Sequence, residues 1–379
     1  MKKTILILLL SIATNLVAQD NTWYAYFAED GFTRGFKNEQ GEVMISPKFK
    51  GFTWAKKFKN IIAVMEDSYL ESAYYLLKNG TKVGKDSLYI WDMAPDCESE
   101  GMIRFRDQKT DKVGFFDGNG KVVIPALYAE ALPFYNGVAV VYDGERVCND
   151  GTKYDKNNPC DHWLLSENTN TLLIDKSNNI LIDDFKYNNL IDLYSIKKND
   201  TTALSYRLTQ VGTNNNYYSF NNYEKQFEDW FFNDFIKDLK FAVQAANIEL
   251  PEYRLLENTM LEIYFHDIKQ ATGKTHKIDA KKFIKDNSEY LAETFIGLQK
   301  EDADYFIGIS GLDSMIWDEP LFEKYFNDCG ESLEAKYPVL SIVSNYKSGE
   351  NNYQEIFKFL KTDEGFKLIG VETPSSKIK

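Results

Sequence analysis

Residues 113–141 read VGFFDGNGKVVIPALYAEALPFYNGVAVV and hold a complete series of strand and turn signals. A strand begins at residues 114–116, and Asp-Gly-Asn-Gly at 117–120 supplies the glycine and asparagine residues that accept the positive φ of a tight hairpin turn. Residues 121–124 are a β-branched return strand that a proline ends, and a second Asn-Gly turn leads into a third strand at 138–141. The stretch therefore predicts one structural unit made of a hairpin, a connector and a third strand.

The same pattern occurs 79 residues earlier, in RGFKNEQGEVMISPKFKGFTWAKKFKNIIAV at residues 34–64. Gly35, Phe36, Gly41, Ile45 and Phe49 stand where the central stretch has Gly114, Phe115, Gly120, Ile124 and Tyr128. Weaker copies use residues 75–83 with 100–105, and residues 173–182. The expected turn residues are Gly41, Gly80, Gly120 and Asn179. A period near 40 predicts about four stacked β-hairpin units, because one such unit cannot bury its own apolar face.

The fourth turn lies 59 residues after Gly120, about twenty more than one period. We place this excess in an inserted loop at residues 144–163, which contains Cys148 and Cys160. A loop-closing disulfide between them is the favoured interpretation, and a zinc site is the alternative. The zinc site is disfavoured because neither cysteine belongs to a C-x-x-C pair. The pairing of Cys97 and Cys329 stays open.

The pattern G-F-x-D-x-x-G-K-V-V-I-P-x-x-Y-x-x-A-x-P-F-x-x-G-x-A-x-V resembles the WG repeat family of bacterial proteins. The resemblance extends over roughly residues 22–205, about half the chain. It implies a repeat scaffold used for binding, with no shared catalytic residues. The family's signature tryptophan is replaced by Arg34 and Val113 in the two best copies, so we expect Trp54 or Trp91 to supply its packing.

Residues 1–18 have a basic start, a short apolar run and Leu-Val-Ala before Gln19, which is typical of a secretory signal peptide. An uncleaved anchor is the alternative, but the apolar run is shorter than the ~20 residues of a spanning helix. We expect a periplasmic or secreted protein with no integral membrane segment after cleavage. The net charge of −13 repels phosphate backbones and argues against nucleic-acid binding.

The second half of the chain has a different periodicity. Residues 212–222 are polar and Asn-rich and predict a linker between a repeat domain at 19–211 and a second domain at 223–379, with a surface loop within one domain as the alternative. The second domain is expected to be α+β, and its order of elements is similar to that of NTF2-like domains. Its expected helices lie at 223–243, 252–271 and 279–300, with a short helix at 320–327, and its expected strands at 305–310, 334–345, 353–361 and 365–372. Tyr223, Phe227, Phe231, Phe235 and Leu239 form an aromatic stripe on the first helix, which we interpret as core, and Asn221 with Glu224 resembles a capping box.

No arrangement of residues predicts catalysis, a cofactor or a metal. His266 and Glu262 share a face of the expected second helix, but the H-E-x-x-H order is absent. Gly308-Ile309-Ser310-Gly311-Leu312 lacks the last glycine of a nucleophile elbow. Trp317, Asp318 and Glu319 form the best candidate for a pocket rim, with a loop around a buried tryptophan as the alternative.

The sequence therefore favours an exported, non-enzymatic binding or scaffold protein whose β-repeat surface takes a protein or a glycan partner. The alternative is a C-terminal module that binds a small ligand or acts as an enzyme, with the repeats as a targeting arm.

Overall fold

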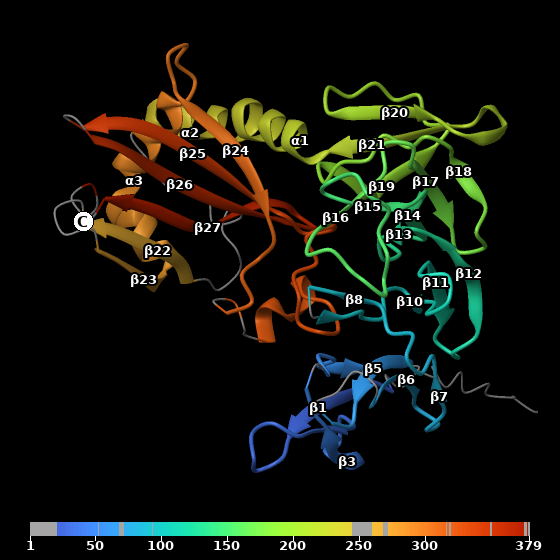
Figure 1. Ribbon diagram of the computed structural model, residues 1–379. Helices are drawn as coiled ribbons and strands as arrows, with labels where there is room; N and C mark the ends of the chain where they lie inside the picture. Colours follow the sequence, from blue (N-terminus) through green and yellow to red (C-terminus); the bar gives the residue numbers. More distant parts are fainter. Residues whose placement is uncertain are drawn as a thin grey trace, which may run out of the picture.

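The structure is a computed structural model that describes residues 21–51, 53–67, 72–92, 94–244, 260–267, 272–315, 317, 320–348, 351–374 and 377. The expected signal peptide, residues 1–18, lies outside these residues. Most described strands pair antiparallel in small sheets, and helices are few. Figure 1 shows the small sheets, coloured blue to yellow-green, beside one larger sheet coloured gold to red.

The N-terminal half is a succession of short strands. They are β1 (Trp23–Phe27), β2 (Arg34–Lys37), β3 (Val43–Phe49), β4 (Lys57–Phe58), β5 (Ile61–Met65), β6 (Ala73–Leu77), β7 (Lys82–Val83), β8 (Ile90–Trp91), β9 (Ala94–Pro95), β10 (Met102–Arg106), β11 (Val113–Asp117), β12 (Val122–Tyr128), β13 (Glu130–Ala131), β14 (Val138–Asp143), β15 (Arg146–Cys148), β16 (Trp163–Leu165), β17 (Asn170–Asp175), β18 (Ile180–Ile182), β19 (Ile191–Lys198), β20 (Arg207–Val211) and β21 (Tyr217–Asn222).

Each hairpin is completed by the closing strand of the unit before it. The sheets run β3-β2-β1-β4, β5-β6-β7, β10-β11-β12, β13-β14-β17-β18 and β19-β21-β20, with β8-β9 and β15-β16 as two-stranded additions. Thus β5 pairs with β6, β10 with β11 and β14 with β17. Because the pairing crosses the boundary between units, each unit needs its neighbour to satisfy its backbone hydrogen bonds.

The two best-matched hairpins have the same register. Phe36 faces Ile45 and Arg34 faces Phe49 in the first, and Phe115 faces Ile124 and Val113 faces Tyr128 in the central one. The register shifts also fall at equivalent positions. All members of the apolar set Phe36, Phe49, Phe115, Ile124 and Tyr128 are buried. The sequence match thus corresponds to a match in backbone pairing and in packing.

A close backbone approach explains the glycine that begins each of these hairpins. A Cβ on Gly114 would lie 2.6 Å from the carbonyl oxygen of Ile124 and 2.8 Å from the amide nitrogen of Ala126. On Gly35 it would lie 2.5 Å from the carbonyl oxygen of Ile45. Backbone atoms of a paired strand cannot move aside cheaply, so both positions require glycine.

Replacing Gly114 with alanine is therefore expected to lower the free energy of unfolding by about 3 kcal/mol. The matched control is Gly80→Ala. Gly80 has φ +83° and nothing within 4 Å of the new Cβ, so only the strained backbone conformation of alanine lowers the free energy of unfolding, by about 1 kcal/mol. Urea unfolding of the oxidised full chain measures both, and equal midpoints for the two variants would contradict the close approach as the reason for glycine.

The hairpin turns share one positive-φ residue. Gly41, Gly80 and Gly120 have φ of 81°, 83° and 75°. In the fourth hairpin the residue with positive φ is Asn178 (62°), whose N–H bonds to Asp175 O as that of Gly120 bonds to Asp117 O. The prediction of Asn179 was thus wrong by one residue, because both positions are asparagine and the sequence alone does not separate them.

The C-terminal half contains one six-stranded sheet. Its strands and helices are α1 (Tyr223–Asp229), a π-helical turn (Trp230–Phe235), α2 (Ile236–Gln244), β22 (Met260–Asp267), β23 (Thr272–Asp279), α3 (Ala280–Gly297), β24 (Tyr305–Ser310), a 3₁₀ helix (Pro320–Tyr325), β25 (Val339–Ser348), β26 (Asn351–Thr362) and β27 (Gly365–Pro374). The sheet order is β23-β22-β27-β26-β25-β24, with β22 and β27 parallel. The aromatic stripe of the first helix and residues of α3 pack on one face of this sheet in a common core, so the interpretation of the stripe as core is confirmed.

Three predictions for this half need correction. The described part of the helix expected at 252–271 is residues 260–267, and it is strand β22. It pairs with β23 over its full length, and this sheet pairing dominates the local helix spacing. The N-cap of α1 is Asn222, whose Oδ1 accepts the N–H of Lys225 at 2.9 Å, one residue after the expected Asn221.

The segment expected as a linker, residues 212–222, is not irregular. It holds a 3₁₀ turn (Thr213–Asn215) and β21, the middle strand of the sheet β19-β21-β20. Tyr218 and Phe220 are buried, and so is Ser219 between them, so this strand is packed on both sides, which the many asparagines obscured.

Candidate binding site at the inserted hairpin

The inserted segment forms a small hairpin held by a disulfide. Strand β15 pairs with β16, and Cys148 is joined to Cys160, the pairing that the sequence favoured. The other edge of β15 is also bonded, since Tyr154 N–H donates to Arg146 O at 3.1 Å and Cys148 N–H to Thr152 O at 2.8 Å. The side chains of this hairpin therefore project from a fixed backbone.

A cleft of about 510 Å³ lies between this hairpin and the turn that joins β10 to β11. It is lined by Lys109, Thr110, Asp111, Lys112, Ala129, Glu145, Arg146, Lys153, Tyr154, Asp155, Lys156 and Asn157. Five of these side chains are basic and three are acidic. A locally cationic lining on a chain with net charge −13 is a feature that solubility alone does not require.

Arg146 is the central cation of the cleft. Its guanidinium pairs with Asp111 and lies 4.2 Å above the ring of Tyr154 and 4.8 Å from that of Trp163. Burial, and secondly the nearby Arg106, lower the pKa of Arg146 to about 10, so it stays charged at neutral pH. Stacking between rings and pairing with a carboxylate fix the direction in which the remaining N–H groups point.

Arg146 is connected through Asp111 to a second group of largely buried charged and polar side chains. Arg106 Nη2 donates to Glu130 at 2.6 Å, and the hydroxyl of Tyr89 donates to the other oxygen of Glu130 at 2.7 Å. Arg106 also lies 3.9 Å from Asp111. Each of these charges has a partner, as buried charges require.

Aromatic rings continue outward from the cleft. Tyr154 contacts Trp163, and Trp163 contacts Trp91 edge to face at 5.7 Å. Trp91 is 56% exposed and Trp54 47%, so neither supplies the buried packing expected in place of the family's tryptophan. At those positions Val113 is itself buried, and Arg34 instead bonds to the carbonyl oxygens of Thr53 and Ala55.

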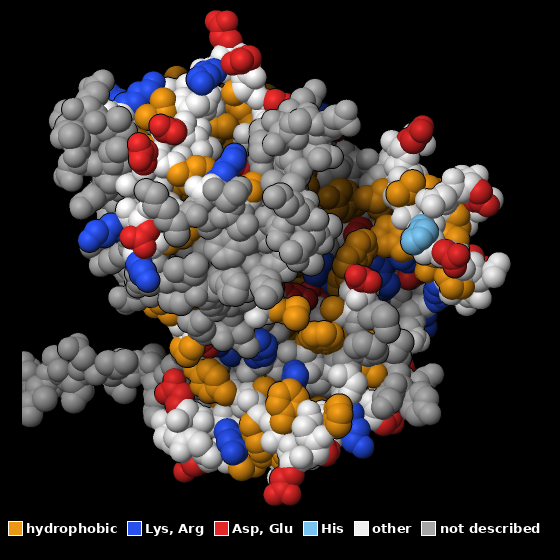
Figure 2. All heavy atoms as spheres, turned by 90° about the vertical axis from the view of Figure 1, so that its left-hand side faces the viewer, with side chains coloured by type: hydrophobic (Ala, Val, Ile, Leu, Met, Phe, Trp, Pro, Cys, Tyr) orange, Lys and Arg blue, Asp and Glu red, His pale blue; other side chains and the backbone are white. Residues whose placement is uncertain are grey.

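Figure 2 shows that hydrophobic side chains on the face it displays occur in separate patches mixed with charged ones. No single continuous apolar surface is visible on the described part of that face. The described part of this face therefore offers no extended apolar docking surface.

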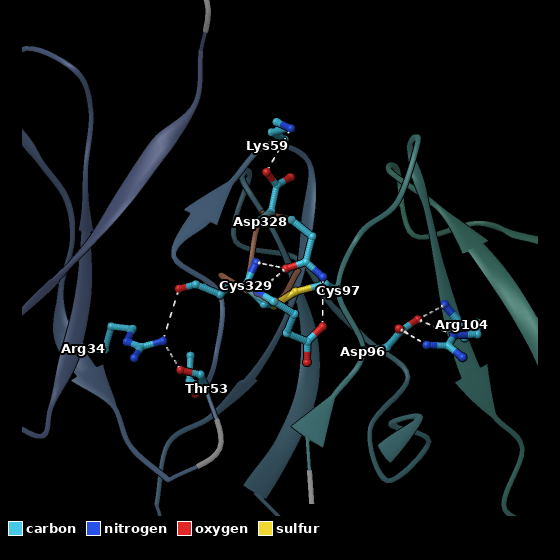
Figure 3. Close-up of a disulfide and its surroundings, with 11 residues drawn as sticks. Arg34, Thr53, Lys59, Asp96, Cys97, Arg104, Asp328 and Cys329 are labelled. Carbon is cyan, nitrogen blue, oxygen red and sulfur yellow. Dashed lines mark hydrogen bonds and ion pairs between the residues drawn. A yellow bond between two sulfur atoms is a disulfide. The ribbon is translucent and has the colours of Figure 1, made fainter. Parts of the chain in front are cut away.

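A second disulfide, Cys97–Cys329, joins the repeats to the C-terminal half across 232 residues (Figure 3). Around it the N–H groups of Lys56 and Lys57 donate to Asp328 O at 2.8 and 2.9 Å, and Lys59 pairs with the Asp328 carboxylate at 2.9 Å. This contact region is structural, because the space beside it is too small for a ligand.

The carboxylate next to this disulfide belongs to a buried ion pair. Asp96 accepts the backbone N–H of Arg104 at 2.8 Å and two guanidinium N–H groups at 2.5 and 3.0 Å (Figure 3). Arg104 also donates to Ala131 O at 2.8 Å and lies 4.0 Å above the ring of Tyr89. Burial alone would lower the pKa of Arg104, but the attraction to Asp96 outweighs it, and the pKa is raised.

The array is also attached to the C-terminal half near its other end. The hydroxyl of Tyr223 donates to Asp192 at 2.9 Å or to Ala335 O at 2.7 Å, and Lys361 pairs with Asp192 at 3.3 Å. Asp192 of β19 is thus bonded to both Tyr223 and Lys361 of the C-terminal half, and Ala335 bonds to the start of α1.

The predicted pocket rim is only partly described. Trp317 is 2% exposed and packs on Phe322 at 4.6 Å, so it belongs to the core and not to a rim. Asp318 and Glu319 lie outside the described residues. A cleft of about 250 Å³ does occur nearby, lined by Leu321, Phe322, Lys324, Tyr325, Thr362, Asp363, Glu364 and Lys367.

The histidines and the serine that the sequence suggested for metal binding or catalysis lie on different elements of the structure. His162 lies in the inserted segment, and His266 and His276 lie opposite Gly273 and Ile263 on the paired strands β22 and β23. Ser310 ends β24 with no helix directly after it. Among the described residues no group of three or more His, Cys, Asp and Glu side chains is placed to hold a metal ion. In the same part of the chain, no helix has the length and apolar character needed to cross a membrane.

The sequence reasoning missed Arg146 and its cleft. The local sequence indicates a binding cleft only through Tyr154 and Trp163, two aromatic residues in a mostly polar insertion. The opposite wall of the cleft comes from a separate turn.

Comparison with known families gives one match: residues 114–145 match the family described as WG containing repeat. This confirms the resemblance predicted for the central stretch and extends it to the start of the insertion. Neither the curated proteins nor the solved structures give a match to this chain. The NTF2-like resemblance of the C-terminal half stays a prediction.

Proposed function

We propose that this chain is an exported, non-enzymatic binding protein whose β-repeat array holds a protein or glycan partner in the cleft beside the inserted hairpin. In this proposal the array spans residues 19–211 as four WG-like units, with the insertion at 144–163 between the third and the fourth. An α+β domain at 223–379 braces the array.

The observation that carries the proposal is the composition of the cleft. A volume of about 510 Å³ lies within the range of roughly 300–1,000 Å³ that small-molecule sites occupy. The insertion adds about twenty residues to the repeat period, and the disulfide Cys148–Cys160 closes the inserted loop. A fixed cation flanked by aromatic rings is suited to binding.

Export is supported by the cysteines as well as by residues 1–18. All four cysteines are in disulfides, and such bonds persist in the periplasm or outside the cell. We therefore place the protein in the periplasm or among secreted proteins.

The alternative function places a small ligand or an activity in the C-terminal half. It is supported by the cleft of about 250 Å³ between the 3₁₀ helix Pro320–Tyr325 and the turn joining β26 to β27. Lys367 and Glu364 in this cleft pair with each other at 3.2 Å, which leaves less charge for a ligand than the larger cleft has.

Hydrogen–deuterium exchange of the oxidised full chain separates the two functions. The chain would be incubated with mixed pools of soluble glycans and peptides, and exchange compared segment by segment. We expect a binding pool to slow exchange at residues 107–112 and 144–157. Slowing confined to residues 320–326 and 361–367 would support the alternative and overturn the array as the binding part.

A further inference from the structure

We propose that the cleft beside the inserted hairpin binds an acidic saccharide, with Lys109, Lys156 and Arg146 receiving its carboxylate groups and Tyr154 stacking on a sugar ring. This inference rests on the proposed function, since it names the partner class for the same cleft.

The cationic side of the cleft has capacity for an added anion. Lys109 and Lys156 are exposed, and neither forms an ion pair with another described residue, whereas Lys153 pairs with Glu145 at 2.8 Å and Lys112 donates to Gly144 O. Two exposed lysines that form no ion pair with another described residue, at one cleft, attract a ligand with negative groups. Behind them Arg146 supplies N–H groups in the planar arrangement that matches a carboxylate.

The acidic and neutral polar side chains argue for hydroxyl groups on the same ligand. Asp155 and Asn157 lie at the cleft with Thr110, and each can accept a hydrogen bond from a hydroxyl group. Three carboxylates in the lining would repel a ligand that is densely anionic, such as a polyphosphate. A sugar acid has one negative group per ring and several hydroxyls, which corresponds to this mixture.

The aromatic rings supply flat surfaces. Tyr154 lines the cleft, and Trp163 and the exposed Trp91 continue outward from it. The face of an aromatic ring is electron-rich and attracts the weakly positive C–H groups on one side of a sugar ring. The exposed Trp91 gives a second stacking position, so we expect an oligosaccharide to bind more tightly than a single sugar.

An acidic peptide is the competing ligand, and the backbone of the hairpin disfavours it. Peptides commonly bind by adding a strand to a free sheet edge. Strand β15 has no free edge here, because β16 bonds to one side and residues 152–154 bond to the other. A peptide in the cleft therefore could not add a strand to β15, which carries Arg146.

Isothermal titration calorimetry of the oxidised full chain tests the inference with tetragalacturonate, maltotetraose and a tetraglutamate peptide. We expect tetragalacturonate to bind at least about tenfold more tightly than the other two. Tight binding of maltotetraose or of the peptide alone would overturn the acidic saccharide. Protection of the cleft by that other ligand in the exchange experiment would leave the proposed function in place.

Variants locate the ligand. We expect Lys109→Ala with Lys156→Ala to weaken tetragalacturonate binding about tenfold, and Tyr154→Leu to weaken it by a similar factor. The control is Lys186→Ala, a lysine that is 73% exposed on a different loop and pairs with Asp184, which should leave the affinity unchanged. Circular dichroism would verify that each variant is folded. Unchanged affinity in folded variants of both kinds would overturn the assignment of these residues.

Discussion

Replacing both Cys97 and Cys329 with alanine is expected to lower the free energy of unfolding by roughly 5 kcal/mol. The pair closes a loop of 232 residues, and in the chain-entropy model the stabilisation grows with the logarithm of loop length. The bond also holds together the contact between Lys56, Lys57 and Asp328, so part of that hydrogen bonding should be lost with it. Urea unfolding followed by fluorescence measures the change.

The matched control is the double variant Cys148→Ala with Cys160→Ala. This pair is only 12 residues apart, for which the same model gives roughly 3 kcal/mol. A larger loss from the short loop than from the long one would contradict the role of Cys97–Cys329 as the main covalent brace between the two halves.

Replacing Asp96 with alanine is expected to cost roughly 4 kcal/mol, because it leaves a buried cation without its partner. The Arg104 side chain is 11% exposed and that of Asp96 only 4%, so water cannot take over the three hydrogen bonds that Asp96 accepts. Two of these come from the guanidinium and one from the backbone N–H of Arg104, so both a charge and an amide lose their acceptor.

The control for this variant is Glu66→Ala. Glu66 pairs with Lys48 and Lys82, but its side chain is 40% exposed and water can replace it, so we expect a loss of about 1 kcal/mol or less. Thermal and urea unfolding should rank the two variants in the same order. Similar losses for both would mean that Arg104 finds another partner when Asp96 is removed.

Local patterns in the sequence were sufficient for the repeats. Phe36 and Phe115 share their register because strand pairing, turn geometry and the glycine before each of them are all set within about fifteen residues. The turn glycines follow from the same short-range rules, and only the choice between Asn178 and Asn179 needed the backbone.

Long-range features were not accessible in this way. The partner of Cys97 is 232 residues away, and nothing in its neighbours indicates Cys329. The sequence MLEIYFHD at 260–267 has apolar residues at alternate positions and also four apart, so its pattern fits both a strand and a helix. Its pairing with β23 determines that it is a strand. The cleft escaped prediction because its two walls come from separate segments, with the turn at 109–112 opposite Arg146.

The nesting of the two disulfides has a consequence for biogenesis. A chain exported from its N-terminus presents Cys97 first, and the next thiols to emerge are Cys148 and Cys160, long before Cys329. Joining thiols in order of arrival would link Cys97 to Cys148, which differs from the pairs in the structure. The short loop brings Cys148 and Cys160 together more often than the longer loop brings Cys97 to either of them, so their pairing would remove both competing thiols. In an exported chain the insertion would thereby leave Cys97 for its late partner, and a chain that paired Cys97 with Cys148 would need thiol–disulfide exchange to reach the pairs in the structure.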